Sequence, residues 1–276
     1  MQCSFGADET GKPVMFDFLW TAHTALGGST RSGKSVCSYR ILSAAAYMPG
    51  IRVCGIDPSG ILLDPHRRGE NDPLIHLGTA DPESAVAVIE RLVKLMDARI
   101  KLILSKGLDQ VPAEAVSADF PTYLVVLEEW PATQAWLEGE DKKRKADERV
   151  LPRMLLAVGR LLREAAKARI LVFTIVQRAE ATTLPGRSQY SRRISFRTDN
   201  TSSVQMLFEI ADAEMVEKVM AFKPGQGLLH EAGDQPRFFK ADRIEYPDYR
   251  ALVENARQRD YSAKRSEAER GSTLVP

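Results

Sequence analysis

The segment GSTRSGKS at residues 28–35 has the residue types and spacing needed to hold a chain of phosphates. It matches the pattern G-x-x-x-x-G-K-[S/T] and is called the phosphate loop below. Glycines allow a turn tight enough for successive N–H groups to point at a phosphate, at the positive end of the following helix. Lys34 places a charge on the β- and γ-phosphates, and the Ser35 hydroxyl is a ligand for Mg²⁺. We therefore predict an ATP–Mg²⁺ site with nucleotide contacts from Gly28, Ser29, Thr30, Arg31, Ser32, Gly33, Lys34, Ser35 and Val36.

A pair of acids follows an apolar run further along the chain. Residues 123–127 read YLVVL, which is typical of a buried strand, and Glu128 and Glu129 come directly after them. We predict Glu128 as the metal-side acid, sharing Mg²⁺ with Ser35, and Glu129 as the catalytic base that polarises the attacking water. Because many strands end in acids, this interpretation depends on the phosphate loop being present.

Gln177 ends another apolar run, at residues 170–176. A polar side chain at the tip of such a strand can hydrogen-bond the γ-phosphate or the attacking water, and can respond when that phosphate is lost. A strand end without any role is the alternative, and the residues alone leave the two open. With Lys34 and Glu129, Gln177 completes the predicted catalytic residues.

These residues need elements to position them, and the pattern of the chain supplies both strands and helices. Strands alternating with helices indicate an α/β fold with a mostly parallel central sheet flanked by helices. Strands are predicted at residues 24–26, 51–57, 123–127 and 170–176, and helices at 34–48, 86–103, 151–168, 202–207 and 213–220. Residues 106–121 are predicted as a loop, and the mixed-charge run 138–149 as a solvated helix face or loop.

The ends and the composition of the chain set further limits. Residues 1–250 are predicted to form one motor domain and residues 251–276 a charged, flexible tail, of which the closing GSTLVP resembles a cloning remnant. Three scattered cysteines make no disulfide framework and fit a reduced, cytoplasmic setting. The apolar runs are strand-sized, too short to span a membrane.

The formal net charge is only +1, so the chain as a whole does not attract polyanions. Any nucleic-acid surface must therefore be local. The candidate is the cluster KKRK at residues 142–145, although acids flank it on both sides.

Short segments in order along the chain resemble motifs of the FtsK/SpoIIIE class of DNA-pumping ATPases, with the actinobacterial conjugative TraB-type members closest. They are FGADETGKPV at 5–14, His23 before the phosphate loop, IDP at 56–58, LMDARIKL at 95–102, IVQR at 175–178, RRISF at 192–196 and PGQG at 224–227. The resemblance spans about residues 5–245.

The resemblance implies more than the residues do alone. It implies a RecA-like P-loop NTPase fold and a homo-oligomeric ring, expected to be a hexamer, that threads double-stranded DNA without reading its sequence. It also implies that Gln177 senses the γ-phosphate, and any membrane-anchoring segment or partner is expected outside this chain.

This chain departs from the family pattern at three places. Arg31 stands at a glycine of the usual GxTGSGKS loop, and Glu128 replaces an aspartate. The arginine that in the family reaches a neighbouring subunit's ATP falls on Ala166 here. The basic residues that we weigh as trans-acting substitutes are Arg163, Lys167, Arg169 and Arg193.

We therefore predict an ATP-dependent double-stranded DNA translocase motor for DNA transfer or segregation. Two alternatives stay open. One is a type VII secretion-like ATPase that moves protein substrates, for which a response to a signal peptide and none to DNA is the distinguishing property. The other is a nucleotide-binding regulator with a weakened site, which would bind ATP without hydrolysing it.

Overall fold

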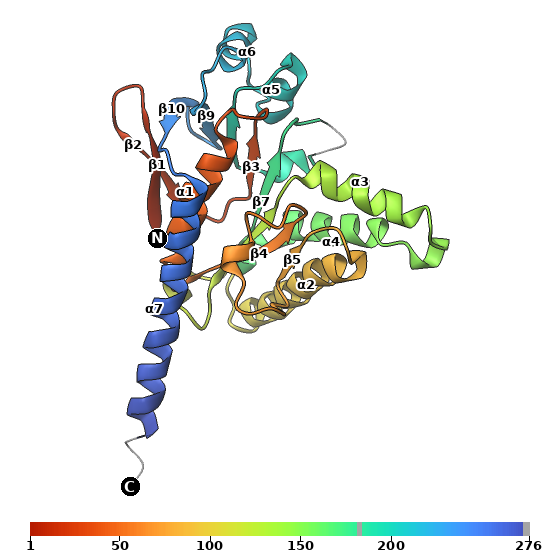
Figure 1. The fold of residues 1–276 in the computed structure, drawn as a ribbon, viewed down its shortest axis with the longest axis vertical. Coiled ribbons are helices and arrows are strands. Elements are labelled where there is room, and N and C mark those ends of the chain that lie inside the picture. Colours follow the sequence, from red (N-terminus) through yellow and green to blue (C-terminus); the bar gives the residue numbers. More distant parts are fainter. Residues whose placement is uncertain (181–183, 273–276) are drawn as a thin grey trace.

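A single ten-stranded sheet organises the part of the chain that the structure describes. The computed structural model describes residues 1–180 and 184–272 (Figure 1). The strand order is β2-β1-β10-β9-β8-β3-β7-β6-β4-β5. The strands are β1 (Gln2–Asp8), β2 (Pro13–Asp17), β3 (Thr24–Gly27), β4 (Ile51–Asp57), β5 (Ile75–Leu77), β6 (Thr122–Leu127), β7 (Ile170–Val176), β8 (Arg192–Phe196), β9 (Gln226–Glu231) and β10 (Arg237–Ala241).

The sheet has a parallel half and an antiparallel half. From β8 through β3, β7, β6 and β4 to β5 every pairing is parallel, whereas β9, β10, β1 and β2 add on as antiparallel neighbours. Every residue of β4 and β7 is buried. Continuous apolar burial is the pattern of parallel strands covered on both faces. The predicted α/β fold with a mostly parallel central sheet is confirmed.

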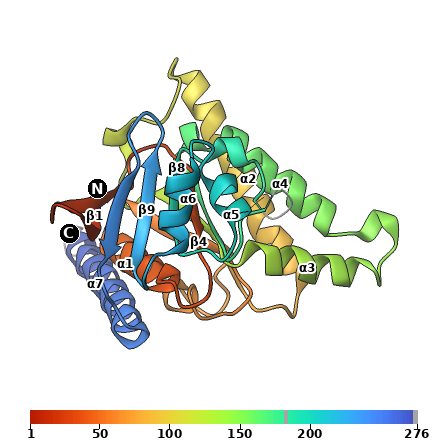
Figure 2. The same cartoon turned by 90° about the horizontal axis from the view of Figure 1, so that it is seen from above.

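Helices cover both faces of this sheet. They are α1 (Lys34–Ala46), α2 (Pro82–Ser105), α3 (Trp130–Asp141), α4 (Leu151–Glu164), α5 (Thr201–Leu207), α6 (Ala213–Met220) and α7 (Tyr246–Ser272). Seen from above, α2, α3 and α4 gather on the side away from β1 and α7 (Figure 2). Asp81 caps α2 by accepting from the Ser84 N–H at 3.1 Å, with Pro82 at the first helical position. The sequence did not predict that α3 starts directly after Glu129.

The C-terminal helix corrects the predicted domain boundary. Instead of a flexible tail from residue 251, α7 begins at Tyr246 and packs its first turns against α1. Val253 is fully buried and Ala256 nearly so, and the Tyr249 ring stacks on Tyr39 of α1 with 4.7 Å between centroids. The tail prediction is wrong for this segment because a few apolar residues at helical spacing suffice to dock it. Residues 273–276 of the closing GSTLVP lie outside the described residues.

Across the described ranges, no helix combines the length and the apolar character needed to cross a bilayer. Cys3, Cys37 and Cys54 are buried free thiols. Burial raises the pKa of Cys3 to about 11 and that of Cys54 to about 12, so both thiols are protonated at neutral pH.

Candidate nucleotide site

The phosphate loop joins β3 to α1 at the carboxyl edge of the parallel strands. Gly33 has φ 113°, in the left-handed region that favours glycine. A Cβ there would lie 2.8 Å from the backbone of Gly225, so the position has room only for glycine. The Gly225 N–H also donates to the Ser32 carbonyl at 2.7 Å. The PGQG turn therefore braces the phosphate loop from the far end of the chain.

Arg31 has a left-handed backbone conformation. This conformation explains why the FtsK/SpoIIIE loop pattern has glycine at the same position. Its φ is 59°, and it is one of the few described residues other than glycine with a positive φ. A side chain in this region costs roughly 1–2 kcal/mol relative to the right-handed region. The chain carries this strain at a loop position where glycine would remove it.

The predicted lysine and base are in direct contact. Lys34 Nζ lies 2.6 Å from Glu129 Oε1, and Lys34 is only 6% exposed. Glu129 also has a left-handed backbone, with φ 41°, at the junction of β6 and α3. Strained backbone of this kind tends to concentrate at functional sites. The sharp turn is what swings the Glu129 carboxylate back toward the phosphate loop.

Glu128 is partly buried beside this ion pair, and one of its carboxylate oxygens lacks a partner. Its Oε2 is buried without a hydrogen bond. Burial is the main cause that raises the pKa of Glu128 to about 8, opposed by Lys34 and supported by the Glu129 and Asp57 carboxylates. An orphaned carboxylate oxygen among other acids is a fit for a divalent cation, which would favour its ionised form. Together with the exposed Ser35 hydroxyl, Glu128 is suited to hold Mg²⁺ directly or through water.

Asp57 has a different task from the acid pair. Its carboxylate accepts hydrogen bonds from the backbone N–H groups of Ser59, Gly60 and Leu63 and from the Ser59 hydroxyl. These contacts fix the loop that follows β4. The IDP segment thus builds the edge of the site without offering a free ligand.

The strand order places Gln177 between the phosphate loop and the acids. In the sheet, β7 lies between β3, which precedes the phosphate loop, and β6, which precedes the acid pair. Gln177 follows β7 directly. The phosphate loop, Gln177 and the acid pair therefore lie in that order along the carboxyl edge of the sheet. The structure thereby brings Lys34, Glu129 and Gln177 to one place.

These residues line one cavity of about 770 Å³, called the nucleotide cavity below. That volume lies within the range of small-molecule sites. Its lining residues are Ser29, Thr30, Arg31, Gly33, Lys34, Ser35, Val36, Glu129, Gln177, Pro224, Gly225, Lys240, Ala241, Arg243 and Glu245.

The segment from Lys240 to Glu245 was missed by the sequence reasoning. It links β10 to α7 and closes one wall of the nucleotide cavity. Lys240 Nζ donates to the Pro224 carbonyl at 2.7 Å, and Arg243 Nε donates to Glu245 at 2.7 Å. No motif marks this segment, and only the PGQG turn beside it hinted at its place.

Two of the four candidate trans-acting residues are engaged within their own chain. Arg169 is buried, and its guanidinium donates to the carbonyls of Val111 and Leu19. Arg193 is partly buried and donates to the carbonyls of Tyr190, Leu207 and Arg187. In this single chain both guanidinium groups hold loops of their own chain, which weakens their case as trans-acting residues. Arg163 and Lys167 are exposed near the end of α4 and remain candidates.

The predicted basic cluster at 142–145 is largely neutralised. Lys142 pairs with Glu138, Lys143 with Glu140, and Arg144 with Glu83. Exposed pairs of this kind contribute little to stability, but they cancel the local positive charge. The cluster therefore gives weaker support for a DNA surface than its composition indicated.

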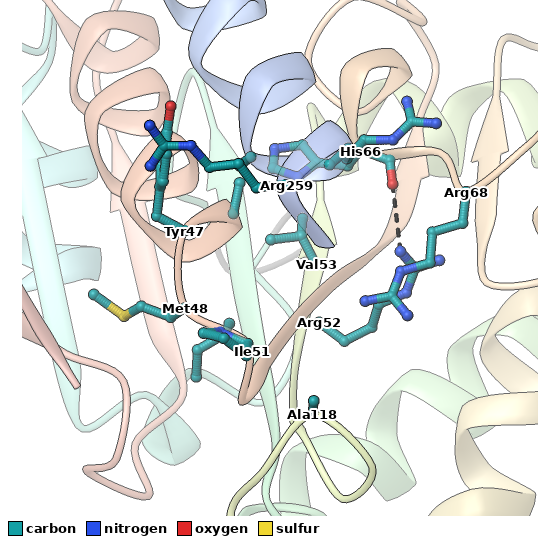
Figure 3. A pocket seen from close by; sticks show the side chains of 13 residues that line it. Tyr47, Met48, Ile51, Arg52, Val53, His66, Arg68, Ala118 and Arg259 are labelled. Carbon is teal, nitrogen blue, oxygen red and sulfur yellow. Dashed lines mark hydrogen bonds between the residues drawn. The ribbon is translucent and has the colours of Figure 1, made fainter. Parts of the chain in front are cut away.

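A second cavity, of about 320 Å³, lies at the amino end of β4, at the opposite edge of the sheet (Figure 3). We call it the arginine cavity after its lining residues Arg52, Arg68, Arg257 and Arg259. Figure 3 shows Arg259 beside Tyr47 on one wall and Arg52 near Arg68 on the other. Arg52 is buried in an ion pair with Asp72, and the His66 ring is hydrogen-bonded to the Tyr249 hydroxyl at 2.9 Å. No residue of the phosphate loop lines this cavity.

The comparison with known families decides the class of the nucleotide site. The sequence profile of the FtsK/SpoIIIE family matches residues 1–180, which is more than half of the chain. The chain belongs to the FtsK/SpoIIIE family. FtsK/SpoIIIE proteins with a phosphate loop are ATP hydrolases, so the nucleotide cavity belongs to an ATPase domain.

Individual FtsK/SpoIIIE relatives are distant in sequence. DNA translocase SftA of Bacillus subtilis (strain 168) is 24% identical over 225 residues, covering 78% of this chain and 22% of SftA. This chain therefore spans less than a quarter of that relative.

Two solved structures share the fold. The pCW3 conjugation coupling protein TcpA, in its monomer form with ATPγS, gives a TM-score of 0.72 at 18% identity and covers 93% of this chain and 70% of TcpA. The cytoplasmic domain of the type VII secretion ATPase EccC of Thermomonospora curvata gives 0.64 at 18%, covering 92% of this chain and 31% of that one. At such identities the likeness extends to the fold and no further.

Proposed function

We propose that this FtsK/SpoIIIE-family chain is the ATP-hydrolysing motor of a double-stranded DNA translocase that acts in DNA transfer or segregation. The observation that carries the proposal is the meeting of Lys34, Glu129 and Gln177 in the nucleotide cavity beside the phosphate loop. Their residue types are those required for phosphate binding, activation of water and detection of the γ-phosphate.

The Lys34–Glu129 ion pair gives ATP binding a direct route to activating the base. Without nucleotide, Lys34 neutralises Glu129. The phosphates of ATP compete for Lys34 Nζ, because a triphosphate carries more negative charge than one carboxylate. Their binding frees the Glu129 carboxylate to accept a proton from the attacking water. Gln177 then positions that water or the γ-phosphate from the tip of β7.

Ser35 and Glu128 are the residues that would hold Mg²⁺ in this mechanism. The ion supplies positive charge to the β- and γ-phosphates when it is bound. Glu128 is one methylene longer than the aspartate usual in the family, and a contact through water accommodates that difference.

The DNA assignment rests on the named relatives. SftA is a DNA translocase and TcpA a conjugation coupling protein. A net charge of +1 requires that DNA contacts be local and directed at phosphates without reading sequence. We further propose a homohexameric ring in the cytoplasm, with Arg163 or Lys167 facing a neighbouring subunit and a membrane anchor or partner supplied from outside this chain.

The test is ATP turnover measured with and without double-stranded DNA at low salt, paired with a mass measurement of the oligomer. DNA should raise turnover, and added salt should remove the stimulation, because phosphate contacts weaken steeply with ionic strength. Stimulation by a secretion signal peptide and none by DNA would instead identify a protein-moving ATPase. Nucleotide binding without turnover, in a preparation shown to be hexameric, would identify a regulator.

A further inference from the structure

Arg31 is the one strained residue in the phosphate loop that carries a large charged side chain. Its left-handed backbone, with φ 59°, is a conformation that glycine adopts freely and arginine does not. Its side chain is exposed and makes no hydrogen bond or ion pair to any residue that the structure describes. Folding therefore gains nothing visible from arginine at this position, and glycine would fold there with less strain.

The other cations of the nucleotide cavity all have partners. Within the described residues, three further basic side chains line it: Lys34 pairs with Glu129, Lys240 donates to the Pro224 carbonyl, and Arg243 pairs with Glu245. Arg31 differs from all three. It is a guanidinium held at the mouth of the cavity with its hydrogen-bonding capacity unused.

The position of Arg31 in the phosphate loop brings its guanidinium close to where the phosphates of a nucleotide would bind. The phosphate loop wraps the phosphates between Gly28 and Ser35, so a side chain that leaves the loop at Arg31 starts beside the backbone groups that hold them. A guanidinium presents a planar fork of donors that matches phosphate oxygens, and it stays charged at any physiological pH.

Two of the four residues considered as substitutes for the arginine that reaches a neighbour's ATP are engaged within their own chain, which leaves only Arg163 and Lys167 of that set. Ala166 occupies the place where the resemblance expects an arginine that reaches a neighbour's ATP. Arg169 and Arg193 are committed to carbonyls of their own chain. Phosphoryl transfer nevertheless needs positive charge near the γ-phosphate in the transition state.

We propose that Arg31 is a catalytic residue acting within its own subunit, where its guanidinium donates to γ-phosphate oxygens and stabilises the transition state. The inference rests on the proposed ATPase function. In the reaction, the water oxygen forms a bond to the γ-phosphorus and the bond to the β–γ bridging oxygen breaks. Glu129 takes the proton from water, and Arg31 remains charged throughout.

The first experiment separates catalysis from binding and folding. Arg31→Gly should lower kcat at least 100-fold, keep ATPγS affinity within about threefold, and leave the melting temperature equal or higher because the backbone strain is relieved. Arg31→Lys keeps a charge but loses the fork, and should recover only part of kcat. Arg259→Ala removes an exposed arginine from the arginine cavity and serves as the matched control with unchanged kcat. Wild-type turnover in Arg31→Gly would overturn the inference.

The second experiment distinguishes action within a subunit from action on a neighbour. Arg31→Gly and Glu129→Gln subunits are mixed so that they assemble together. If Arg31 serves its own site, every site in the mixture lacks one catalytic group and turnover stays absent. If it serves the neighbouring site, an Arg31→Gly subunit next to a Glu129→Gln subunit regains a complete site, and restored turnover overturns the inference. A wild-type chain with no turnover at all would overturn the proposed function as well, so the two failures are distinguishable.

Discussion

The nucleotide cavity and the arginine cavity are both lined by cationic side chains, but they differ in whether those side chains have partners within the chain. In the arginine cavity the most buried cation, Arg52, is matched by Asp72, and the His66 ring is hydrogen-bonded to Tyr249. In the nucleotide cavity Arg31 has no partner in the described chain, and Glu128, next to the lining residue Glu129, has a buried Oε2 with no hydrogen-bond partner. Of the three described residues other than glycine with positive φ, Arg31 and Glu129 line the nucleotide cavity, Arg169 lines neither cavity, and none lines the arginine cavity.

The difference separates charge that stabilises a fold from charge that awaits a ligand. A buried charge whose ion-pair and hydrogen-bond partners are all present gains little free energy from contact with a ligand. The unpaired Glu128 oxygen and the strained backbone at Arg31 and Glu129 instead cost the fold free energy. Contacts with a bound nucleotide and cation can offset that cost. The following predictions test that distinction, in order of decreasing expected effect.

Lys34→Ala should have the largest effect. It removes the charge that meets the phosphates and leaves Glu128 and Glu129 beside each other without a compensating cation. We expect ATPγS affinity to fall roughly 100-fold or more, as expected for loss of charge-assisted hydrogen bonds. Isothermal titration calorimetry measures this directly. Retained affinity would mean that nucleotide binds elsewhere, and the contrast between the two cavities would then be lost.

Glu129→Gln should separate binding from chemistry. The amide cannot accept the proton from water, so kcat should fall about 1,000-fold while ATPγS still binds. The substitution also removes the competitor for Lys34, so affinity should be equal or higher. Equal loss of affinity and kcat would contradict the assigned role.

Asp72→Ala should affect stability alone. It leaves Arg52 buried without a counter-charge and removes an acceptor for the backbone N–H groups of Arg68 and Leu74. We expect the free energy of unfolding to fall by about 3–5 kcal/mol, with ATPγS affinity unchanged. The double change Arg52→Met with Asp72→Leu should lose less, because no buried charge is left unpaired. A matching loss of nucleotide affinity in the single variant would show that the two cavities are coupled.

Acid should weaken the fold through two buried histidines. Burial lowers the pKa of His66 to about 3 and that of His23 to about 4, whereas unfolded histidine titrates near 6.5. The unfolded chain therefore binds more protons between about pH 6.5 and 4, and stability is lost as the pH falls through that window. From pH 7 to pH 5 each histidine should contribute a loss of about 2 kcal/mol, whereas Glu128, whose pKa is raised to about 8, contributes an opposing gain because the folded chain binds its proton first. Urea unfolding of wild type and His66→Gln at pH 7 and 5 isolates one histidine: the wild type should lose about 2 kcal/mol more than the variant, and equal pH dependence of the two would contradict the assignment.

Much of the site could be predicted because its chemistry lies in contiguous residues. The phosphate loop, the acids after 123–127 and the glutamine after 170–176 each stand at the end of an apolar run, and parallel strands bring such ends to one edge. The insertion of β7 between β3 and β6 was not predictable from these patterns, because crossover connections leave no mark in local sequence. The wall from Lys240 to Glu245 was missed for the same reason.

The C-terminal helix shows a different limit of sequence reasoning. Residues 251–276 are mostly polar and charged, and composition favoured a tail. What docks α7 is a handful of side chains, among them Tyr249 and Val253, that match a surface formed by distant residues. The surface that α7 packs against exists only once the rest of the chain has folded. Arg169 is a further case, since nothing in the local sequence distinguishes a buried arginine from an exposed one.

The burial of the cysteines has a practical consequence for labelling this protein with fluorescent dyes. Because all three native thiols are buried and those of Cys3 and Cys54 are held protonated, thiol-reactive dyes should ignore them at neutral pH. A cysteine introduced on an exposed face, such as the solvent side of α7, would then be labelled alone without removing any native residue. Fluorescence from one such dye in each subunit would test the proposed ring assembly and report nucleotide-driven movement in the otherwise unaltered chain.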